Sequence, residues 1–497
     1  MIKLQQHFIG FVLILLFASC ASRKGIAVAD RRYAPEQARA DVVLLKKILE
    51  ANHPSLYWYT PKDSIDYYFN AVTAGITDSL TEQQFKNKVS WVVSKIRCGH
   101  TAVRNSKAYY RETGKVPRPQ FPLIIKTWKD SMVVLANLFK NDTVFTRGTV
   151  ITGINGLSNK QMLDSMFQLI STDGYSDNFK SQVISMNFPG YYRNSFGISD
   201  KYTINYLDST GKPHTGTIGN YDVKADTAKK SVAVQHLPPL TRRELRRADL
   251  SAKRSLRIDT ATHTAYMRLT TFSEGRLRRF FARSFRQLHQ QQVQNLIIDL
   301  RENGGGSIAL SNKLTRYLSD HPFVTADTLA TPSRRLRYGK YIHPAWVYWI
   351  SMHFAAHKQA DGRYHFIHYE KHAYKPYTKN HFSGQVYVLQ GGYTFSAATM
   401  FIANIKSQPN VTTTGEETGG GSYGNSSVHL PSVRLPNTGL QVVLPLFRVV
   451  INSKQPKTGR GLIPDIAIYP TSNAIERNAD IKMEKLQAII AAHATPQ

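Results

Sequence analysis

The sequence has few cysteines, and this limits how its fold can be stabilised. Its 497 residues include 2 cysteines, Cys20 and Cys98. If Cys20 carries a lipid, as its context below indicates, no disulfide can form within the mature chain. Stability must then come from burial of apolar side chains, and a chain of this length has room for about two to four domains with hydrophobic cores.

Long apolar runs are also missing, apart from one near the N-terminus. Residues 8–17 form that run, with Lys3 before it and small residues after it, which is the pattern of an export signal over residues 1–20. The run is shorter than the roughly 18 residues that span a membrane, and no later segment reaches that length. Small residues directly before Cys20 resemble the bacterial lipobox, which predicts cleavage there and a diacylglycerol on Cys20. The alternative is an ordinary signal peptide that contains a cysteine.

The residues after Cys20 bear on location. Residues 21–24 read Ala-Ser-Arg-Lys and lack the aspartate that retains lipoproteins in the inner membrane. In a Gram-negative host we therefore expect a cell-envelope protein, lipid-anchored to the outer membrane and facing the periplasm.

Acidic residues are scarce beside basic ones. The chain has 64 Lys and Arg against 34 Asp and Glu, a formal net charge of +30, with the densest stretches at residues 242–247 and 276–279. Such a surface attracts anionic lipid head groups or other polyanions, so the membrane is an expected partner through the anchor and the basic surface. The alternative is a solvated face that keeps the protein soluble. Nucleic acid is not an expected partner of an exported lipoprotein.

The spacing of apolar residues divides the chain after the signal. Residues 21–116 have apolar positions every three or four residues, at 40–51 and 85–96, which predicts a helical N-terminal domain. Residues 117–221 contain short strand-like runs closed by an Asn-Gly turn signal, which predicts a small β-rich module. The basic, proline-containing residues 222–257 are interpreted as a linker.

Residues 258–472 alternate strands and helices, which predicts an α/β domain. A strand, a helix and a second strand follow one another, and this unit favours a parallel pair with helices packed on the sheet. The expected elements are strands at 264–269, 295–300 and 385–390, helices at 276–291 and 396–407, and a C-terminal helix within 473–497.

Two turns at the ends of buried strands could carry chemistry. Residues 304–306 are three glycines directly after a strand, where backbone N–H groups can face a developing negative charge. A plain turn or a phosphate cradle is the alternative. Ser396 stands between a strand and a helix, where the helix end is positive and the Ala397 N–H is free. By itself Ser396 could equally be a helix N-cap.

Together these turns resemble the tail-specific, or C-terminal processing, protease family. In that family a strand ending in Asp-Leu-Arg-x-Asn-x-Gly-Gly supplies the oxyanion-hole glycine, and a later Ser-Ala turn supplies the nucleophile. The matching segments here are residues 299–306 and 396–397, with further similar segments at 96–101, 415–421 and 459–465. The resemblance runs from about His53 to Tyr469.

The resemblance implies a fold and a set of site residues. It implies a crotonase-like spiral α/β core preceded by a PDZ or PDZ-like module, which residues 147–156 resemble; a generic β-subdomain is the alternative. A PDZ-like module would bind an extended peptide or C-terminus by β-augmentation. Ser396 is then the nucleophile, and the backbone of Gly305, Gly306 and Ala397 forms the oxyanion hole.

The resemblance offers two candidates for the base that activates Ser396. Tail-specific proteases use a lysine after the nucleophile, but no lysine lies between Lys406 and Lys454, and Lys406 is too far along its helix. Tricorn-type members use an N-terminal histidine, and His100 stands in the matching motif, so we expect it to be the general base.

The tricorn pattern also has a glutamate downstream of the serine, and here this chain departs from it. No glutamate lies within residues 418–475. The site is then a Ser–His dyad, or a group from elsewhere orients His100, or activity is reduced. Glu417 is the candidate orienter, with a structural loop role as the alternative. Asp299 and Arg301 are expected to pair and fix the oxyanion loop.

A histidine-rich segment suggests a metal site only weakly. Seven of the 17 histidines lie within residues 343–381, and His353 and His357 have the spacing that puts two imidazoles on one helix face. The glutamate of a zincin is missing, because Phe354 takes its place. We expect no metal and no cofactor, and interpret the segment as an aromatic surface insertion that covers the cleft or meets the membrane.

Three classes of function follow. The first is a serine-type peptidase acting on unfolded or C-terminal segments of exported proteins. The second is a catalytically silent relative that binds peptides through the PDZ-like module and cleft, and the missing Lys and Glu favour it. The third is an envelope protein that binds anionic surfaces.

Overall fold

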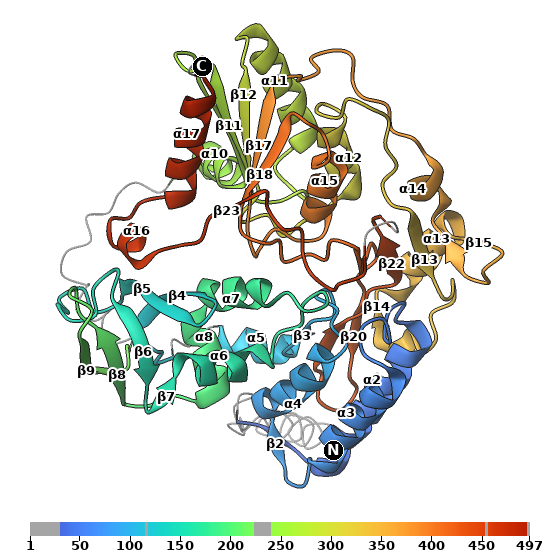
Figure 1. The fold of residues 1–497 in the computed structure, drawn as a ribbon. Coiled ribbons are helices and arrows are strands. Elements are labelled where there is room, and N and C mark those ends of the chain that lie inside the picture. Colours follow the sequence, from blue (N-terminus) through green and yellow to red (C-terminus); the bar gives the residue numbers. More distant parts are fainter. Residues whose placement is uncertain (1–29, 115–117, 223–239, 453–455, 495–497) are drawn as a thin grey trace, which may run out of the picture.

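The N-terminal region is helical, as predicted. The computed structural model describes residues 30–114, 118–222, 240–452 and 456–494 (Figure 1). Cys20 and the signal lie outside these residues. Helix α4 begins with a capping box, in which the Thr81 hydroxyl accepts from the Gln84 N–H and the Gln84 side chain accepts from the Thr81 N–H. The elements are β1 (Arg32–Tyr33), α2 (Pro35–Asn52), α3 (Lys62–Ala74), β2 (Leu80–Thr81), α4 (Glu82–Ser94), β3 (Val103–Arg104) and α5 (Lys107–Thr113).

These helices share their core with a distant part of the chain. Val42, Leu45 and Leu49 on one face of α2 are fully buried, and they belong to one apolar cluster with Leu440 and Phe447. Strand β3 also pairs with β21 (Gln441–Val443). The N-terminal region therefore packs directly on late strands of the chain, and the segment near His100 lies beside them.

The middle region is an antiparallel sheet covered by helices (Figure 1). Its strand order is β4-β5-β6-β8-β9, and β7 pairs with β6. Asn155 and Gly156 both have positive φ and form the predicted turn. Residues 159–196 are largely helical, which the expectation of a β-rich module missed. The elements are β4 (Leu123–Trp128), β5 (Ser131–Asn137), β6 (Val150–Ile154), β7 (Leu157–Ser158), α6 (Asn159–Phe167), α7 (Asp177–Met186), α8 (Phe188–Phe196), β8 (Lys201–Leu207) and β9 (Pro213–Gly219).

The segment interpreted as a linker is partly structured. Residues 223–239 lie outside the described part of the chain, but α10 (Arg242–Lys253) is a helix and β10 (Arg254–Asp259) is a sheet strand. The helix begins with a capping box between Thr241 and Glu244. A capping box marks the start of a helix, so the linker interpretation is wrong from residue 241 onward.

The α/β region is a six-stranded, mostly parallel sheet in the order β10-β11-β12-β17-β18-β23, with β10 antiparallel at its edge (Figure 1). The predicted strand–helix–strand unit is confirmed, because β11 and β12 are parallel and α11 joins them. Its elements are β11 (Thr264–Leu269), α11 (Leu277–Gln290), β12 (Asn295–Asp299), α12 (Ile308–Thr315), β17 (Gln385–Gln390), α15 (Ala397–Ile405), β18 (Val411–Gly415), β23 (Ile466–Ala467), α16 (Ser472–Glu476) and α17 (Ile481–Ala494).

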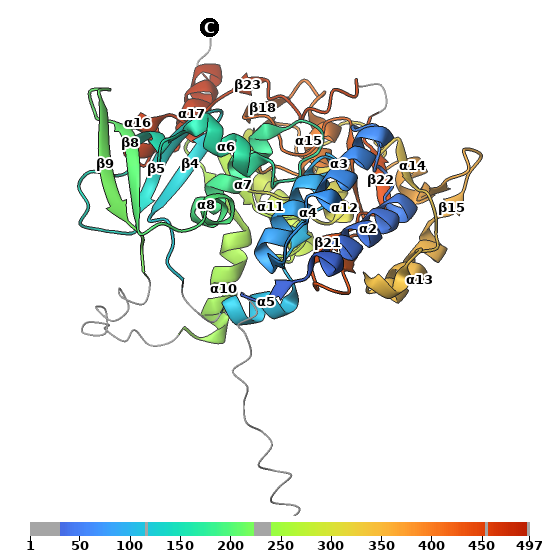
Figure 2. The same ribbon diagram turned by 90° about the horizontal axis from the view of Figure 1, so that it is seen from below.

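Two further sheets lie between this core and the N-terminal helices (Figures 1 and 2). One has the order β15-β16-β13-β22-β19 and the other β14-β20-β21-β3. Their elements are β13 (Thr328–Thr331), η1 (Gly339–Tyr341), β14 (Ile342–His343), α13 (Ala345–Ala355), β15 (His357–Lys358), β16 (Tyr364–His365), α14 (Ile367–Lys371), β19 (Gly424–Ser427), β20 (Ser432–Arg434), β21 and β22 (Phe447–Val450). Among the helices of residues 30–114, 118–222, 240–452 and 456–494, none is both long and apolar enough to cross a membrane.

Candidate active site

Ser396 sits on a tight turn between a buried strand and a buried helix. Strand β17 ends at Gln390 and α15 begins at Ala397, and Ser396 between them has φ 54° and ψ −123°. This is a sparsely populated conformation for a residue with a side chain, and surrounding contacts must hold it. The Thr394 hydroxyl donates to the Leu300 carbonyl at 2.8 Å, and the Phe395 N–H donates to the Asn303 carbonyl at 3.0 Å.

The glycine loop lies directly against this turn. A Cβ atom on Gly305 would be 2.7 Å from the Cβ of Ser396, and Gly305 has φ +96°. Gly306 has φ +137°, and a Cβ there would be 2.5 Å from the Ser273 nitrogen. Both positions therefore require glycine. The turn that follows β12 and the turn that follows β17 meet at one edge of the sheet.

The backbone N–H groups that are free to bind an oxyanion differ from the three that were expected. The Gly305 N–H donates to Asn303 Oδ1 at 2.9 Å, which removes it from the donors expected for an oxyanion. Neither the Gly306 N–H nor the Ala397 N–H has an acceptor among the described residues. The Ala397 N–H is free because it opens helix α15. The contribution of Gly305 to the site is instead that it has no side chain, which lets the loop lie close to Ser396.

His100 and Ser396 line the same cavity. The cavity has a volume of about 600 Å³, and residues 304–306, Phe395 and Tyr393 line it too. The His100 ring packs on Phe395 at 4.8 Å between centroids, and its Nδ1 is buried without a hydrogen-bond partner among the described residues. Burial lowers the pKa of His100 to about 4, so the imidazole is neutral at pH 7.

The backbone on both sides of His100 is held by buried side chains. Asp173 Oδ1 accepts from the Gly99 N–H at 2.8 Å, and the His53 Nε2 lies 2.9 Å from the Thr101 hydroxyl. His53 Nδ1 accepts from the Ser55 N–H at 3.1 Å, so Nε2 carries the proton and donates to Thr101. Cys98 is buried, and burial raises the pKa of its thiol to about 11, which makes it an unreactive core residue.

Asp173 is a site residue that the sequence did not reveal. It is 2% exposed, and its Oδ2 lies 3.5 Å from the Gly421 nitrogen in the loop after strand β18. Burial raises the pKa of this carboxyl to about 7. An aspartate followed by glycine in a loop reads as a turn signal, so only the tertiary contact with Gly99 identifies it.

Glu417 does not orient His100. One carboxylate oxygen pairs with Arg460, the other accepts from the Gly461 N–H at 2.7 Å, and its carbonyl accepts from Asn178. Glu417 does not line the cavity of Ser396. The expectation that Glu417 orients His100 is wrong, because Arg460 and Gly461 bind both oxygens of its carboxylate. Its role is the alternative one, in the structure of the loop.

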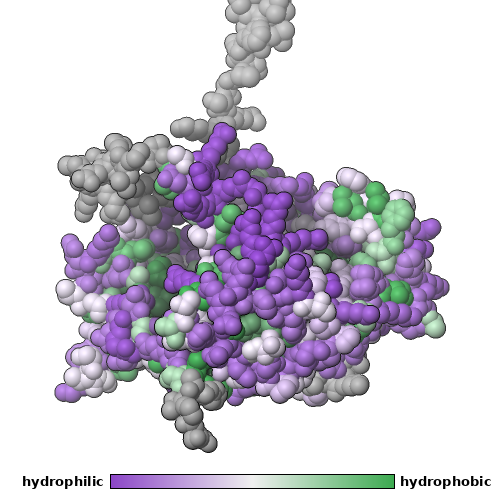
Figure 3. Space-filling view, turned by 90° about the horizontal axis from the view of Figure 1, so that it is seen from above, coloured by the Kyte–Doolittle hydropathy of each residue, from purple (hydrophilic) through white to green (hydrophobic). Residues whose placement is uncertain are grey.

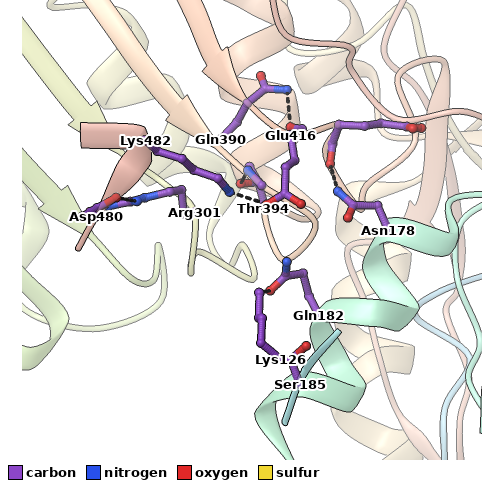
Figure 4. A network of polar contacts seen from close by, with 12 residues as sticks. Lys126, Asn178, Gln182, Ser185, Arg301, Gln390, Thr394, Glu416, Asp480 and Lys482 are labelled. Carbon is purple, nitrogen blue, oxygen red and sulfur yellow. Dashed lines mark hydrogen bonds and ion pairs between the residues drawn. The ribbon is translucent and has the colours of Figure 1, made fainter. Parts of the chain in front are cut away.

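Arg301 and Asp299 pair as predicted and extend into a larger network. Arg301 also donates to both carboxylate oxygens of Asp480 at 2.7 Å. Figure 4 shows Lys482 directed toward Glu416, and these two form a buried ion pair. The network ties the segment that precedes the glycine loop to the start of helix α17.

The remaining candidates lie elsewhere. Lys406 pairs with Asp465 at 2.7 Å and donates to the Ile463 carbonyl, away from Ser396. His353 and His357 do not share a helix face, because α13 ends at Ala355 and His357 begins β15. Among the described residues, no group of three or more His, Cys, Asp or Glu could hold a metal ion.

One region of the sequence and the fold are similar to those of known proteins. Residues 263–468 match the family described as peptidase family S41. The fold is similar to that of mature CPAF, with a TM-score of 0.63 and 13% identity over 92% of this chain and 96% of that one. Mature CPAF complexed with lactacystin gives a TM-score of 0.63 and 13% identity over 92% and 98%. A putative peptidase from Parabacteroides merdae gives 0.45 and 13% over 92% and 97%.

No curated protein matches the sequence. The family match covers the glycine loop and Ser396, and the fold brings both to one cavity. Over residues 263–468 the chain therefore matches peptidase family S41, the family of tail-specific proteases, and it is a serine-type peptidase.

Proposed function

We propose that this protein hydrolyses peptide bonds in exported proteins, with Ser396 as nucleophile and His100 as general base. The observation that carries the proposal is the single cavity lined by Ser396, His100 and the glycine loop. The proposal includes a crotonase-like core and a PDZ-like module formed by the sheet of β4 to β9, whose edge strands could take up an extended peptide.

In the proposed reaction Ser396 Oγ attacks the scissile carbonyl carbon while the neutral imidazole of His100 takes the hydroxyl proton. The N–H groups of Gly306 and Ala397 stabilise the oxyanion. His100 then gives the proton to the leaving amine, the C–N bond breaks, and an acyl-enzyme remains. A water molecule, deprotonated by the same imidazole, releases the new carboxyl terminus and restores Ser396.

The proposed base works without a carboxylate on its ring. The buried Nδ1 of His100 has no partner among the described residues, and Asp173 acts on the backbone next to it. We therefore propose a Ser–His dyad whose imidazole is placed by packing on Phe395 and by the contacts of Gly99 and Thr101. Asp173 and His53 are positioning residues in this scheme.

We further propose that the chain works in the cell envelope, held by a lipid on Cys20 to the outer membrane and facing the periplasm. The support is the sequence alone, in the apolar run and small residues before Cys20. Mass spectrometry of the N-terminal peptide tests it, since an unmodified cysteine or retained signal contradicts the anchor.

Casein hydrolysis by the full chain tests the peptidase proposal. We expect Ser396→Ala and His100→Ala each to lose about 10³-fold or more in activity, as when a nucleophile or its base is removed. A serine-directed phosphonate should label the wild type and not Ser396→Ala. Activity of Ser396→Ala equal to that of the wild type overturns the assignment.

A catalytically silent peptide-binding protein is the second candidate. The unpartnered Nδ1 of His100 favours it, because no carboxylate fixes the tautomer of the ring. Inertness of the wild type toward varied unfolded proteins, with no phosphonate labelling and retained peptide binding, would move this candidate to first place.

A further inference from the structure

An arginine-lined groove of about 640 Å³ runs between helices α10 and α11. The face of the molecule over these helices is predominantly hydrophilic in Figure 3. Among the described residues that line the groove there is no aspartate or glutamate. Its arginines are Arg243, Arg246, Arg247, Arg254, Arg276 and Arg283.

Within the described part of the chain, most of these arginines have no neutralising partner. Arg254 donates to the Gly275 carbonyl and lies over the Phe280 ring at 4.5 Å. The others form no ion pair with any described residue. The acids nearby are already used, since Asp249 and Glu274 bind Lys253 and Glu244 caps its helix. Like charges in one groove repel one another, and a bound anion would relieve that repulsion.

The groove lies close to the cavity of Ser396. A hollow of about 450 Å³ lies between them, sharing Ser273 with that cavity and Arg276 with the groove. The segment that forms this path is fixed to the glycine loop, because the Phe272 N–H donates to the Gly305 carbonyl at 2.8 Å. A polypeptide held at Ser396 can therefore extend along Ser273 toward the arginines.

We propose that the groove binds acidic side chains of the peptide substrate. Cleavage at Ser396 would then favour chains with a cluster of Asp or Glu on one side of the scissile bond, several residues from it. The proposal rests on the proposed peptidase function and adds the substrate class. Arginine suits this role, because its planar guanidinium binds carboxylates through two parallel hydrogen bonds.

The observations favour a peptide over an anionic membrane surface. A lipid head group would need only the exposed arginines of α10, whereas the path from Ser273 through Arg276 leads into the catalytic cavity. The floor of the groove also includes Leu250, Leu256 and Phe280, which suit the aliphatic parts of an extended chain. Binding to anionic vesicles alone is an outcome that the experiment separates.

The test compares peptides that share one cleavable core and carry a six-residue extension of Glu or of Gln, on the N-terminal or the C-terminal side. We expect the Glu extension on one side to raise kcat/KM about tenfold at low salt through KM, and added NaCl to remove the gain. The paired variant Arg246→Gln/Arg283→Gln should lose the preference and still cleave the Gln peptide. Arg111→Gln/Arg335→Gln removes the same charge outside the groove and should keep it.

Binding of the same peptides to the Ser396→Ala protein, followed by fluorescence anisotropy, separates the two proposals. If the Glu peptide binds more tightly but the wild type cleaves neither peptide, the peptidase proposal is wrong and the groove proposal stands. Equal binding and cleavage of the Glu and Gln peptides overturns the groove. Binding of vesicles of anionic phospholipid through Arg246 and Arg283, with no preference for the Glu peptide, overturns it in favour of a membrane contact.

Discussion

Asp173 Oδ1 accepts a hydrogen bond from the Gly99 N–H at 2.8 Å, one residue before His100. Asp173 belongs to the loop between α6 and α7, and its other oxygen faces Gly421, after strand β18. One buried carboxyl thus joins the middle region, the histidine segment and the loop beyond Ser396. The contact holds the backbone beside His100, while the ring Nδ1 of His100 has no hydrogen-bond partner among the described residues.

Removing the side chain of Asp173 should displace His100. We expect Asp173→Ala to lower kcat/KM about 10- to 100-fold, because small misplacements of a catalytic group reduce rates by such factors. Asp173→Asn keeps an acceptor for the Gly99 N–H and should remain within about threefold at pH 6. Asp41→Ala is the matched control, since Asp41 is buried and accepts from the Thr438 N–H far from the cavity. Equal losses in both alanine variants, per folded molecule, would refute a positioning role.

Asp173 should also make stability depend on pH. Its native pKa is raised to about 7 from 3.8 by burial, so the folded protein holds a proton that the unfolded chain releases. Its contribution to stability is therefore full below pH 3.8 and is lost as pH rises to about 7, by on the order of 4 kcal/mol. Asp173→Asn should flatten this dependence. Denaturant unfolding between pH 4 and pH 8 measures it, and parallel curves for the two proteins would contradict it.

The sequence predicted which residues line the site better than it predicted the contacts that position them. The glycine loop and Ser396 could be recognised because each depends on local backbone geometry at the end of a strand. The partner of Gly99 could not, since Asp173 lies in a distant loop and reads as a turn residue. The same limit explains Glu417, which is close to Ser396 in sequence but directed toward Arg460. The helix at Arg242–Lys253 was missed for another reason, because its charge pattern outweighed its capping signal.

On the acid side, activity should fall at a lower pH than it would with a base that has the ordinary histidine pKa. Burial lowers the pKa of His100 to about 4 from 6.5, and a general base must be neutral. We expect the limb of the kcat/KM profile that reports His100 to fall with a midpoint near pH 4. Initial rates on one fluorogenic peptide between pH 3.5 and pH 9, with Asp173→Asn in parallel, provide the profile. A midpoint near 6.5 in both proteins would show that His100 is solvated in the working enzyme.

A methyl group on Gly305 should disable the site. It would lie 2.7 Å from both the Phe395 carbonyl oxygen and the Ser396 Cβ, at a φ of +96°. We expect Gly305→Ala to lose about 10²-fold or more in kcat, as when an oxyanion contact is disturbed. Gly211→Ala separates crowding from backbone strain, because Gly211 has φ +84° and nothing within 4 Å of a Cβ. Phosphonate labelling rates of the two variants measure the difference, and a Gly305→Ala rate equal to that of Gly211→Ala would contradict the prediction.

Substitution of Glu417 should leave the chemistry intact. Its carboxylate pairs with Arg460 and accepts from the Gly461 N–H, so Glu417→Gln removes one charge from a loop contact. We expect kcat/KM to stay within about threefold and stability to fall by about 1 kcal/mol, as for a partly exposed ion pair. An orienting carboxylate behaves differently, since its conversion to an amide in a serine protease triad lowers kcat about 10⁴-fold. Steady-state kinetics of Glu417→Gln beside His100→Ala therefore decides the role, and a loss as large as that of His100→Ala would return Glu417 to the catalytic machinery.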